Sequence, residues 1–190
     1  MKKNYLFACL VSLLILTGCS SSPNHIIFYP DVSFSNAITT SGTADINVID
    51  ERTLYALVSV KHPDDSVTYL KPSEDIQKRF NQQFREGFAS FGVLHQVTAD
   101  TAITIKLNQI HVEIMQTHFN YKATMRMEVL VEITQTPDKF SKTFYASGEQ
   151  QGPLSFDKAR IERDLNALAG RLINDVITDE EIRKVTATLN

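Results

Sequence analysis

Apolar and polar residues alternate along several stretches of the chain, which is the pattern of strands with one buried face. The clearest alternation runs over Tyr121–Ile133. Ile103–Leu107 and Ile110–Ile114 alternate as well, but their apolar positions fall on opposite parity. A bulge near Asn108-Gln109 would return both trios to one face of the sheet. With Phe140–Ser147 pairing back after a turn, the pattern predicts a three-stranded antiparallel meander.

The first half of the chain holds further strand patterns. Asp45–Ile49 and Leu54–Val60 flank the turn-like residues Asp50–Thr53, which predicts a hairpin. Ile26–Phe34 also alternates, but it contains Pro30, which has no amide hydrogen to donate to a neighbouring strand. This segment is therefore expected to be an edge strand or an extended arm.

Two stretches instead repeat apolar residues at helical spacing. The first follows a cap candidate, Ser73, and stops at Gly92, and the second spans Phe156–Ile177. A capping box at Thr178–Glu181 predicts a short third helix. The first stripe is Ile76, Phe80, Phe84, Phe88 and Phe91, and the second is Ile161, Leu165, Leu168, Leu172 and Val176. Such a phenylalanine stripe could line a ligand site, but it is far more often the face that packs on a sheet.

Together these elements predict the α+β class. We expect a mostly antiparallel sheet with two long helices packed on one face and a short C-terminal helix. Residues 26–190 are expected to form this α+β domain as a single unit, since the chain shows no internal repeat or low-complexity block.

The beginning of the chain follows a different pattern. Lys2-Lys3 precedes an apolar run over Tyr5–Leu16, which is too short to cross a membrane as a helix and is typical of a signal peptide. The run ends in Leu16-Thr17-Gly18-Cys19, which resembles the lipobox of bacterial lipoproteins. This resemblance implies cleavage between Gly18 and Cys19. It also implies a diacylglycerol and an N-acyl chain such as palmitate on Cys19.

The sequence thus divides into a signal peptide at 1–18, a lipidated cysteine with its tether at 19–25, and the periplasmic domain at 26–190. The resemblance to bacterial lipoproteins also implies sorting: Ser20 and Ser21 after the cysteine suggest the outer membrane, whereas an aspartate directly after it would have suggested retention in the inner membrane. The first alternative is an ordinary secreted protein in which the cysteine occurs by chance. The second is a signal anchor, in which the apolar run is not cleaved.

Charge and cysteine content limit the function classes. Loss of Lys2 and Lys3 with the signal peptide leaves 17 basic against 22 acidic residues, which argues against a nucleic-acid partner. The two cysteines are Cys9, which leaves with the signal peptide, and Cys19, which carries lipid. The mature chain is therefore expected to have no disulfide and no thiol for catalysis.

Candidate chemistry beyond the lipid is sparse. His111, Glu113 and His118 form the only cluster that could bind a metal such as zinc, and it lacks a supporting motif such as HExxH. No serine lies in a GxSxG context, and the glycines form no phosphate-binding pattern. We therefore predict no catalytic residue, no metal and no cofactor apart from the acyl groups on Cys19.

Several of these features together resemble the YajG-like lipoprotein family of gammaproteobacteria. The resemblance rests on the LTGC tetrad, on the extended segment around Pro30, on Val48–Thr53 with its D-x-R-T ending, and on the helix after Ser73. It implies an envelope address and a fold, with no enzymatic activity to carry over. It also implies that Asp50 and Arg52 are placed for structural reasons.

The sequence therefore predicts a lipid-anchored protein on the periplasmic face of the outer membrane. The leading hypothesis is a non-enzymatic structural or accessory binding module of the cell envelope, with envelope proteins as partners. One alternative is a carrier of a lipid or muropeptide ligand, which predicts an apolar cavity between the phenylalanine stripe and the sheet. The other is an envelope hydrolase, which predicts paired acids or a histidine–acid pair in a cleft.

Overall fold

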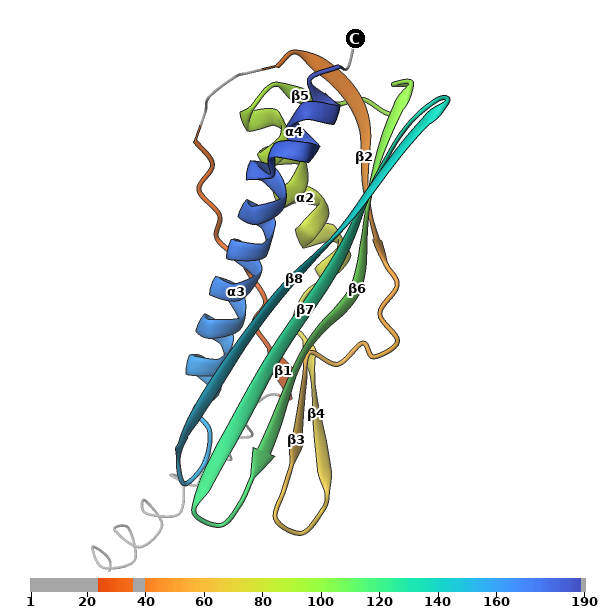
Figure 1. Ribbon diagram of the computed structural model, residues 1–190. Coiled ribbons are helices and arrows are strands. Elements are labelled where there is room, and N and C mark those ends of the chain that lie inside the picture. The colour runs from red at the N-terminus through yellow and green to blue at the C-terminus, as the bar shows by residue number, and fades with distance from the viewer. Residues whose placement is uncertain (1–23, 36–39, 189–190) are drawn as a thin grey trace, which may run out of the picture.

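The computed structural model describes residues 24–35 and 40–188, and this part of the chain forms an α+β fold. Eight strands build one curled, mixed sheet, and three helices pack against it (Figure 1). The signal peptide, the cleavage site and Cys19 lie outside the described residues. Within those residues, no helix is both long and apolar enough to span a membrane.

The long meander predicted from alternation is confirmed. It consists of β6 (Thr101–Gln116), β7 (Asn120–Gln135) and β8 (Asp138–Pro153), paired antiparallel. The register shifts between Leu107 and Gln109, so the predicted bulge is present. Because of it, the two apolar trios of β6 face the core together: Ile103, Ile105, Leu107, Ile110, Val112 and Ile114 are all buried.

The predicted hairpin before it is wrong. The strands β2 (Gly42–Asp50) and β3 (Val58–Lys61) do not pair with each other, and both run parallel to β6. They lie end to end along the same edge of β6: β2 pairs with the part before the bulge and β3 with the part after it. The turn-like residues after Asp50 thus mark a break between two strands rather than a reversal. The sheet is therefore mixed and not mostly antiparallel.

Shorter strands complete the edges of the sheet. β3 and β4 (Val67–Pro72) form an antiparallel hairpin, and β1 (His25–Ile26) pairs parallel to β4. The chain then continues as the expected extended arm, which contacts the helix that follows β8 through hydrogen bonds from Ile27 N to Glu162 and from Tyr29 N to Asn166, both 2.8 Å. At the other end of this strand order, β5 (Val93–His95) pairs with the start of β2.

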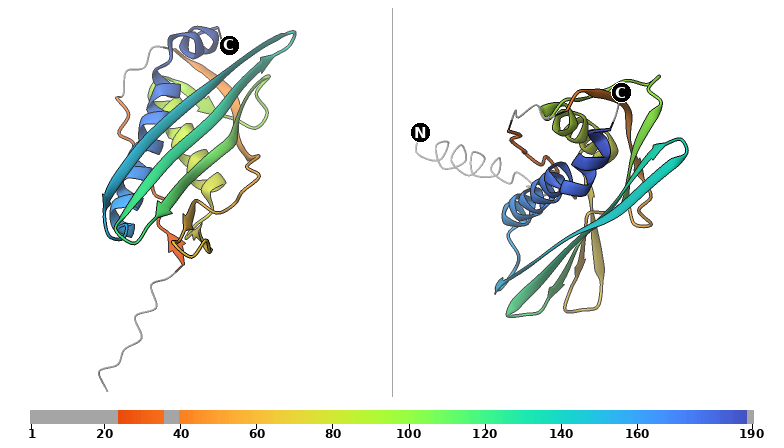
Figure 2. Two further views of the ribbon diagram at one scale, coloured as in Figure 1. Left: turned by 60° about the horizontal axis from the view of Figure 1, so that its bottom comes forward. Right: turned by 45° about the horizontal axis from the view of Figure 1, so that its top comes forward.

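The helices depart from the prediction of two long helices packed on one face. α2 (Ile76–Ser90) has 15 residues, α3 (Lys158–Thr178) has 21 and α4 (Glu180–Thr186) has 7. Because the sheet curls, α2 packs against β2 and β5, while α3 runs along β8 and touches β7 (Figures 1 and 2). The N-cap of α2 is Asp75 rather than Ser73, and Gly92 follows the helix with a positive φ of 107°, as expected for a helix stop.

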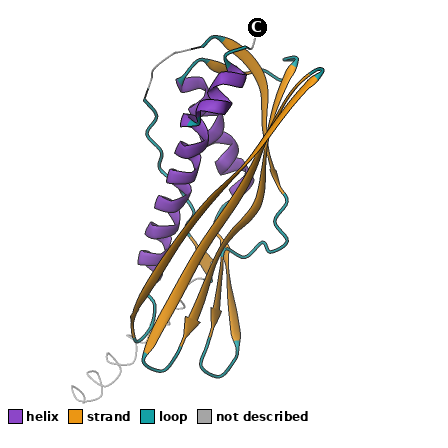
Figure 3. Ribbon diagram, viewed as in Figure 1, coloured by secondary structure: helices purple, strands orange, loops and turns teal. Residues whose placement is uncertain are grey.

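Strand register defines two ends of the molecule. Lys61 pairs with Met115 and Asn120 with Pro153, which brings together the β3–β4 turn (62–66), the β6–β7 turn (117–119) and the β8–α3 loop (154–157). We call this the Phe119 end, where the strands extend beyond the helices (Figure 3). The β5–β6 loop (96–100) and the β7–β8 turn (136–137) lie together at the opposite end, the Val97 end.

Candidate functional site

A buried ion pair lies at the break between β2 and β3. Arg52 donates from Nε to Asp50 Oδ1 and from Nη2 to Asp50 Oδ2, each at 2.8 Å. The Arg52 side chain is only 3% exposed. Asp50 Oδ1 also accepts a hydrogen bond from the Arg52 amide at 3.2 Å. Two hydrogen bonds from the guanidinium group and one from the backbone amide hold this turn in a single geometry.

The pair also determines the ionisation of Asp50. Burial raises the pKa of this carboxyl, but the hydrogen bonds and the positive charge of Arg52 outweigh it and bring the pKa below its usual value. A general acid needs the opposite shift, toward the working pH. Asp50 is thus suited to a structural ion pair, as the family resemblance implied.

Cavities flank this ion pair on two sides. One has a volume of about 440 Å³ and is lined by residues that include Tyr55, Lys71 and Glu74. The other, of about 220 Å³, is lined by residues that include Thr53 and His111. The remaining nitrogen of the guanidinium, Arg52 Nη1, is buried and has no hydrogen-bond partner among the described residues. Because that atom is shielded from solvent, a ligand in either cavity could not reach it.

The acids of the larger cavity serve local structure. Glu74 accepts a hydrogen bond from Arg79 Nη2 at 2.8 Å, and Asp75 caps α2 by accepting from Lys78 N at 3.1 Å. With Asp50 bound to Arg52, each acid lining this cavity already has a partner. The cavity therefore offers a polar surface for a ligand, built from groups that also maintain the fold.

The three metal candidates do not converge on one site. His111 lies over the β3 region, with Nε2 2.8 Å from Ser59 Oγ and Nδ1 3.3 Å from the Ala56 carbonyl oxygen. Burial is the main reason why the pKa of His111 is lowered. Glu113 is exposed on β6, and His118 lies in the β6–β7 turn with its ring 6.5 Å from that of Phe119. The described part of the chain brings no three His, Cys, Asp or Glu side chains close enough to hold a metal.

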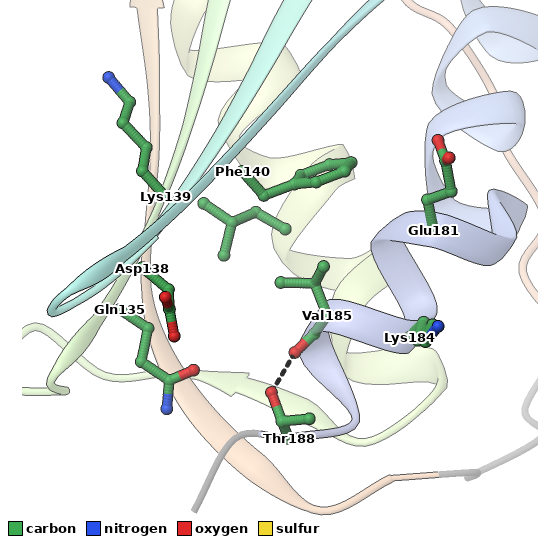
Figure 4. A pocket seen from close by; sticks show the side chains of 9 residues that line it. Gln135, Asp138, Lys139, Phe140, Glu181, Lys184, Val185 and Thr188 are labelled. Atoms are coloured by element: carbon green, nitrogen blue, oxygen red, sulfur yellow. Dashed lines mark hydrogen bonds between the residues drawn. The ribbon is translucent and has the colours of Figure 1, made fainter.

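A third cavity lies at the Val97 end, between the β7–β8 turn and α4. Its volume is about 500 Å³, and Phe140 and Val185 face each other across it (Figure 4). Ile133 adds a further apolar wall, while Glu181 and Lys184 supply charge from α4. The side chains could surround a small apolar group, and charged residues could orient its polar end.

The phenylalanine stripe, by contrast, is filled by its own side chains. Phe80, Phe84 and Phe88 are fully buried. Phe80 stacks on Phe28 at 5.5 Å and on Phe84 at 6.0 Å between ring centroids. The stripe is core, as the sequence analysis favoured.

Two features of these sites went unrecognised in the sequence. One is the burial of Arg52, and the other is the cavity between Phe140 and Val185. The D-x-R spacing was a signal for the ion pair itself. The burial and the cavity depend on contacts between distant segments, which a periodic pattern does not specify.

The chain is similar to solved structures. Protein XCC0632 from Xanthomonas campestris, of the family DUF330, matches with a TM-score of 0.56 at 11% identity, over 80% of this chain and 91% of that one. The crystal structure of an uncharacterized protein matches with a TM-score of 0.48 at 7% identity, over 85% of this chain and 99% of that one. At these identities the first likeness shows the fold alone.

Sequence comparison identifies the family. No curated protein matches the chain. A family described as uncharacterized lipoprotein, Lipoprotein_16, matches residues 30–186, which is most of the chain and nearly all of its described part. The YajG-like family resemblance is thereby confirmed; Asp50–Thr53 lies within the matched residues, and the LTGC tetrad precedes them. The chain belongs to the YajG family of uncharacterized lipoproteins.

Proposed function

We propose that this protein is anchored by lipid on Cys19 to the periplasmic face of the outer membrane and serves as a non-enzymatic accessory binding module of the cell envelope. The observation that carries the proposal is the lipoprotein family match over 30–186, joined to the LTGC tetrad at the start of the same chain. Anchoring raises the local concentration of partners on the same membrane, which benefits a weak binder.

Two carboxyl groups of the domain are held ionised by lysine partners. Hydrogen bonds from Lys106 and Lys139 lower the pKa of Glu132. Burial raises the pKa of Asp179, but hydrogen bonds from Lys142 and from the α4 backbone outweigh it and lower that pKa as well. Carboxyl groups with lowered pKa values stay ionised and paired, which suits recognition and stability better than proton transfer.

The outward face of β7 is the surface best suited to a protein partner. Lys122 and Arg126 are exposed on it, and Thr124, Glu128 and Glu132 alternate with them. β7 is flanked by β6 and β8 along its whole length, so the face is broad and its backbone is fully paired. A partner would therefore contact side chains of mixed charge rather than add a strand.

Crosslinking in cells tests this proposal. A photoreactive amino acid at Arg126 should capture a distinct envelope protein. The matched control is the same substitution at Arg163, an exposed arginine on α3 whose side chain is 70% exposed. Capture of lipid alone from position 126, or the same products from both positions, would contradict a partner on this face.

The cavity at the Val97 end favours a second candidate, a carrier of a small lipid or muropeptide group. Its volume of about 500 Å³ and its apolar walls at Phe140 and Val185 support this function. The predicted location between the phenylalanine stripe and the sheet is instead filled by aromatic rings. Native mass spectrometry should then find a bound ligand that Val185→Trp, which places a bulky ring in the cavity beside Phe140, removes or weakens. An unliganded wild-type protein contradicts the carrier function.

A further inference from the structure

The Phe119 end exposes three large apolar side chains, two of them in adjoining loops. Phe119 is 81% exposed, Leu154 67% and Met115 55%. They come from the β6–β7 turn, the β8–α3 loop and the end of β6, which strand pairing places side by side. Single exposed apolar residues are ordinary, but a cluster on adjoining loops indicates an interaction surface.

Hydrogen bonds hold this cluster in an ordered arrangement. The amide of Leu154 donates to the Phe119 carbonyl oxygen at 2.8 Å, which ties the two loops together. Leu154 has a φ of 61°, a left-handed conformation that leucine rarely adopts. Thr117 Oγ1 accepts from the amides of Phe119 at 3.3 Å and Asn120 at 3.0 Å. The local structure therefore maintains the exposure of both apolar side chains.

The chain enters the fold from the same end. β1 runs parallel to β4, with His25 opposite Lys71. Tracing the chain backward from His25 therefore leads along β4 toward Val67, which adjoins the β3–β4 turn. Four residues of strand, from Lys71 back to Val67, span about 13 Å. The five residues between Cys19 and His25 can span about 17 Å, so the tether is long enough to place its lipid beside the Phe119 end.

We propose that the Phe119 end is a membrane-contact surface, with Phe119, Leu154 and Met115 inserted among the headgroups of the bilayer that holds the lipid of Cys19. The inference rests on the proposed anchoring. A short tether keeps the domain at the bilayer, and apolar side chains there gain by leaving water. The long strands would then direct the Val97 end away from the membrane.

Charges around the cluster favour a shallow contact that depends little on salt. Lys61 pairs with Asp65 at 2.9 Å and Lys122 with Glu149 at 2.9 Å, so both signs are present. Asp64 lies in the same β3–β4 turn and accepts hydrogen bonds from Ser66. These acids disfavour deep insertion and give no basic patch for anionic lipid.

The test uses the lipidated mature chain in vesicles of phosphatidylethanolamine and phosphatidylglycerol. If Cys19 is blocked by lipid and Cys9 is removed, a cysteine introduced elsewhere is the one reactive thiol. Phe119→Cys carries a bimane label, and Val97→Cys is the matched control, since Val97 is 74% exposed at the opposite end. We expect a blue-shifted emission and a loss of iodide quenching at position 119 upon vesicle binding, with neither change at 97.

The outcomes separate this inference from the anchoring itself. Protein that floats with the vesicles while both labels stay equally open to iodide would overturn the membrane-contact surface and leave the anchor intact. Protein that does not float overturns the anchor, and the inference with it. Repeating the measurement in 0.5 M salt should preserve the blue shift, and its loss would contradict an apolar contact.

Discussion

Phenylalanine occupies two opposite environments in this molecule. Phe80, Phe84 and Phe88 repeat at helical spacing on α2 and are fully buried, whereas Phe119 lies in the turn between β6 and β7 and is exposed. The stripe packs ring against ring, while the turn directs one ring into solvent beside Leu154. The element that carries a phenylalanine thus decides whether its ring packs in the core or is exposed on the surface.

The largest expected effect separates these two environments directly. Phe84→Ala should lower the free energy of unfolding by about 3–5 kcal/mol, because it removes a fully buried ring and leaves a cavity. Phe119→Ala should change it by less than about 0.5 kcal/mol, because that ring is in water. Urea denaturation followed by circular dichroism measures both. Similar losses from the two variants would contradict the division into core and surface.

The ion pair between Asp50 and Arg52 is a largely buried polar interaction beside the apolar core. Arg52→Ala should cost about 3 kcal/mol, since it leaves a largely buried carboxylate without its partner. The exposed Arg163→Ala is the control and should be close to neutral. Adding Asp50→Asn to Arg52→Ala should recover part of the loss, because the unpaired charge is removed. A double variant less stable than Arg52→Ala would contradict this account.

The same pair predicts a dependence on pH. The pKa of Asp50 is lower in the folded state than its usual value, so its stabilising contribution is present above that usual value, near 4. The contribution is lost as the pH falls through the folded pKa. The difference in unfolding free energy between wild type and Arg52→Ala should therefore be constant from pH 7 to 5 and shrink at lower pH. A difference that grows below pH 4 would reverse the assigned sign.

Gly87 lies where α2 packs closely against α3. A Cβ at Gly87 on α2 would lie 2.7 Å from Ile177 Cγ1 on α3, whereas a Cβ at Gly148 on β8 would be 4.0 Å from its nearest neighbour, Met125 Sδ. Gly87→Ala should thus cost about 1–3 kcal/mol through overpacking. Gly148→Ala, the control, should be nearly neutral. Equal thermal shifts of the two variants would show that the α2–α3 contact can yield.

The smallest effect is expected at the cap of α4. Asp179 accepts hydrogen bonds from the amides of Glu181 and Ile182, both at 3.1 Å. Asp179→Ala should cost about 1 kcal/mol. Asp179→Asn keeps an acceptor for the cap but loses the ion pair with Lys142, so it should recover only part of that loss. Thermal unfolding of both variants checks this, and an unchanged Asp179→Ala protein would contradict the capping role.

The sequence pattern predicted those parts of the fold that depend on which face of a strand or helix each side chain occupies. The shift in parity at Asn108 predicted the bulge because a strand can bury both trios only by adding a residue. The helical spacing of the phenylalanines predicted α2 and its buried face. The structural placement of Asp50 and Arg52 was implied by the family resemblance, and their D-x-R spacing lets the two side chains meet across one turn residue.

Strand partners were not predictable in the same way. Alternation identifies a half-buried strand but carries no information on the direction of its neighbour, so β2 and β3 were interpreted as a hairpin. The burial of Arg52 follows from their end-to-end arrangement along β6, and the cavity between Phe140 and Val185 follows from where α4 docks. Both depend on contacts between segments far apart in the chain.

The central claim is the lipid on Cys19, and labelling with palmitate tests it most directly. Wild-type protein should incorporate the label and sediment with the outer membrane, while Cys19→Ser should lose the label and leave that fraction. Circular dichroism of the serine variant should show the fold retained, since the domain lies beyond the tether. A serine variant that is still processed and held in the outer membrane would contradict the account.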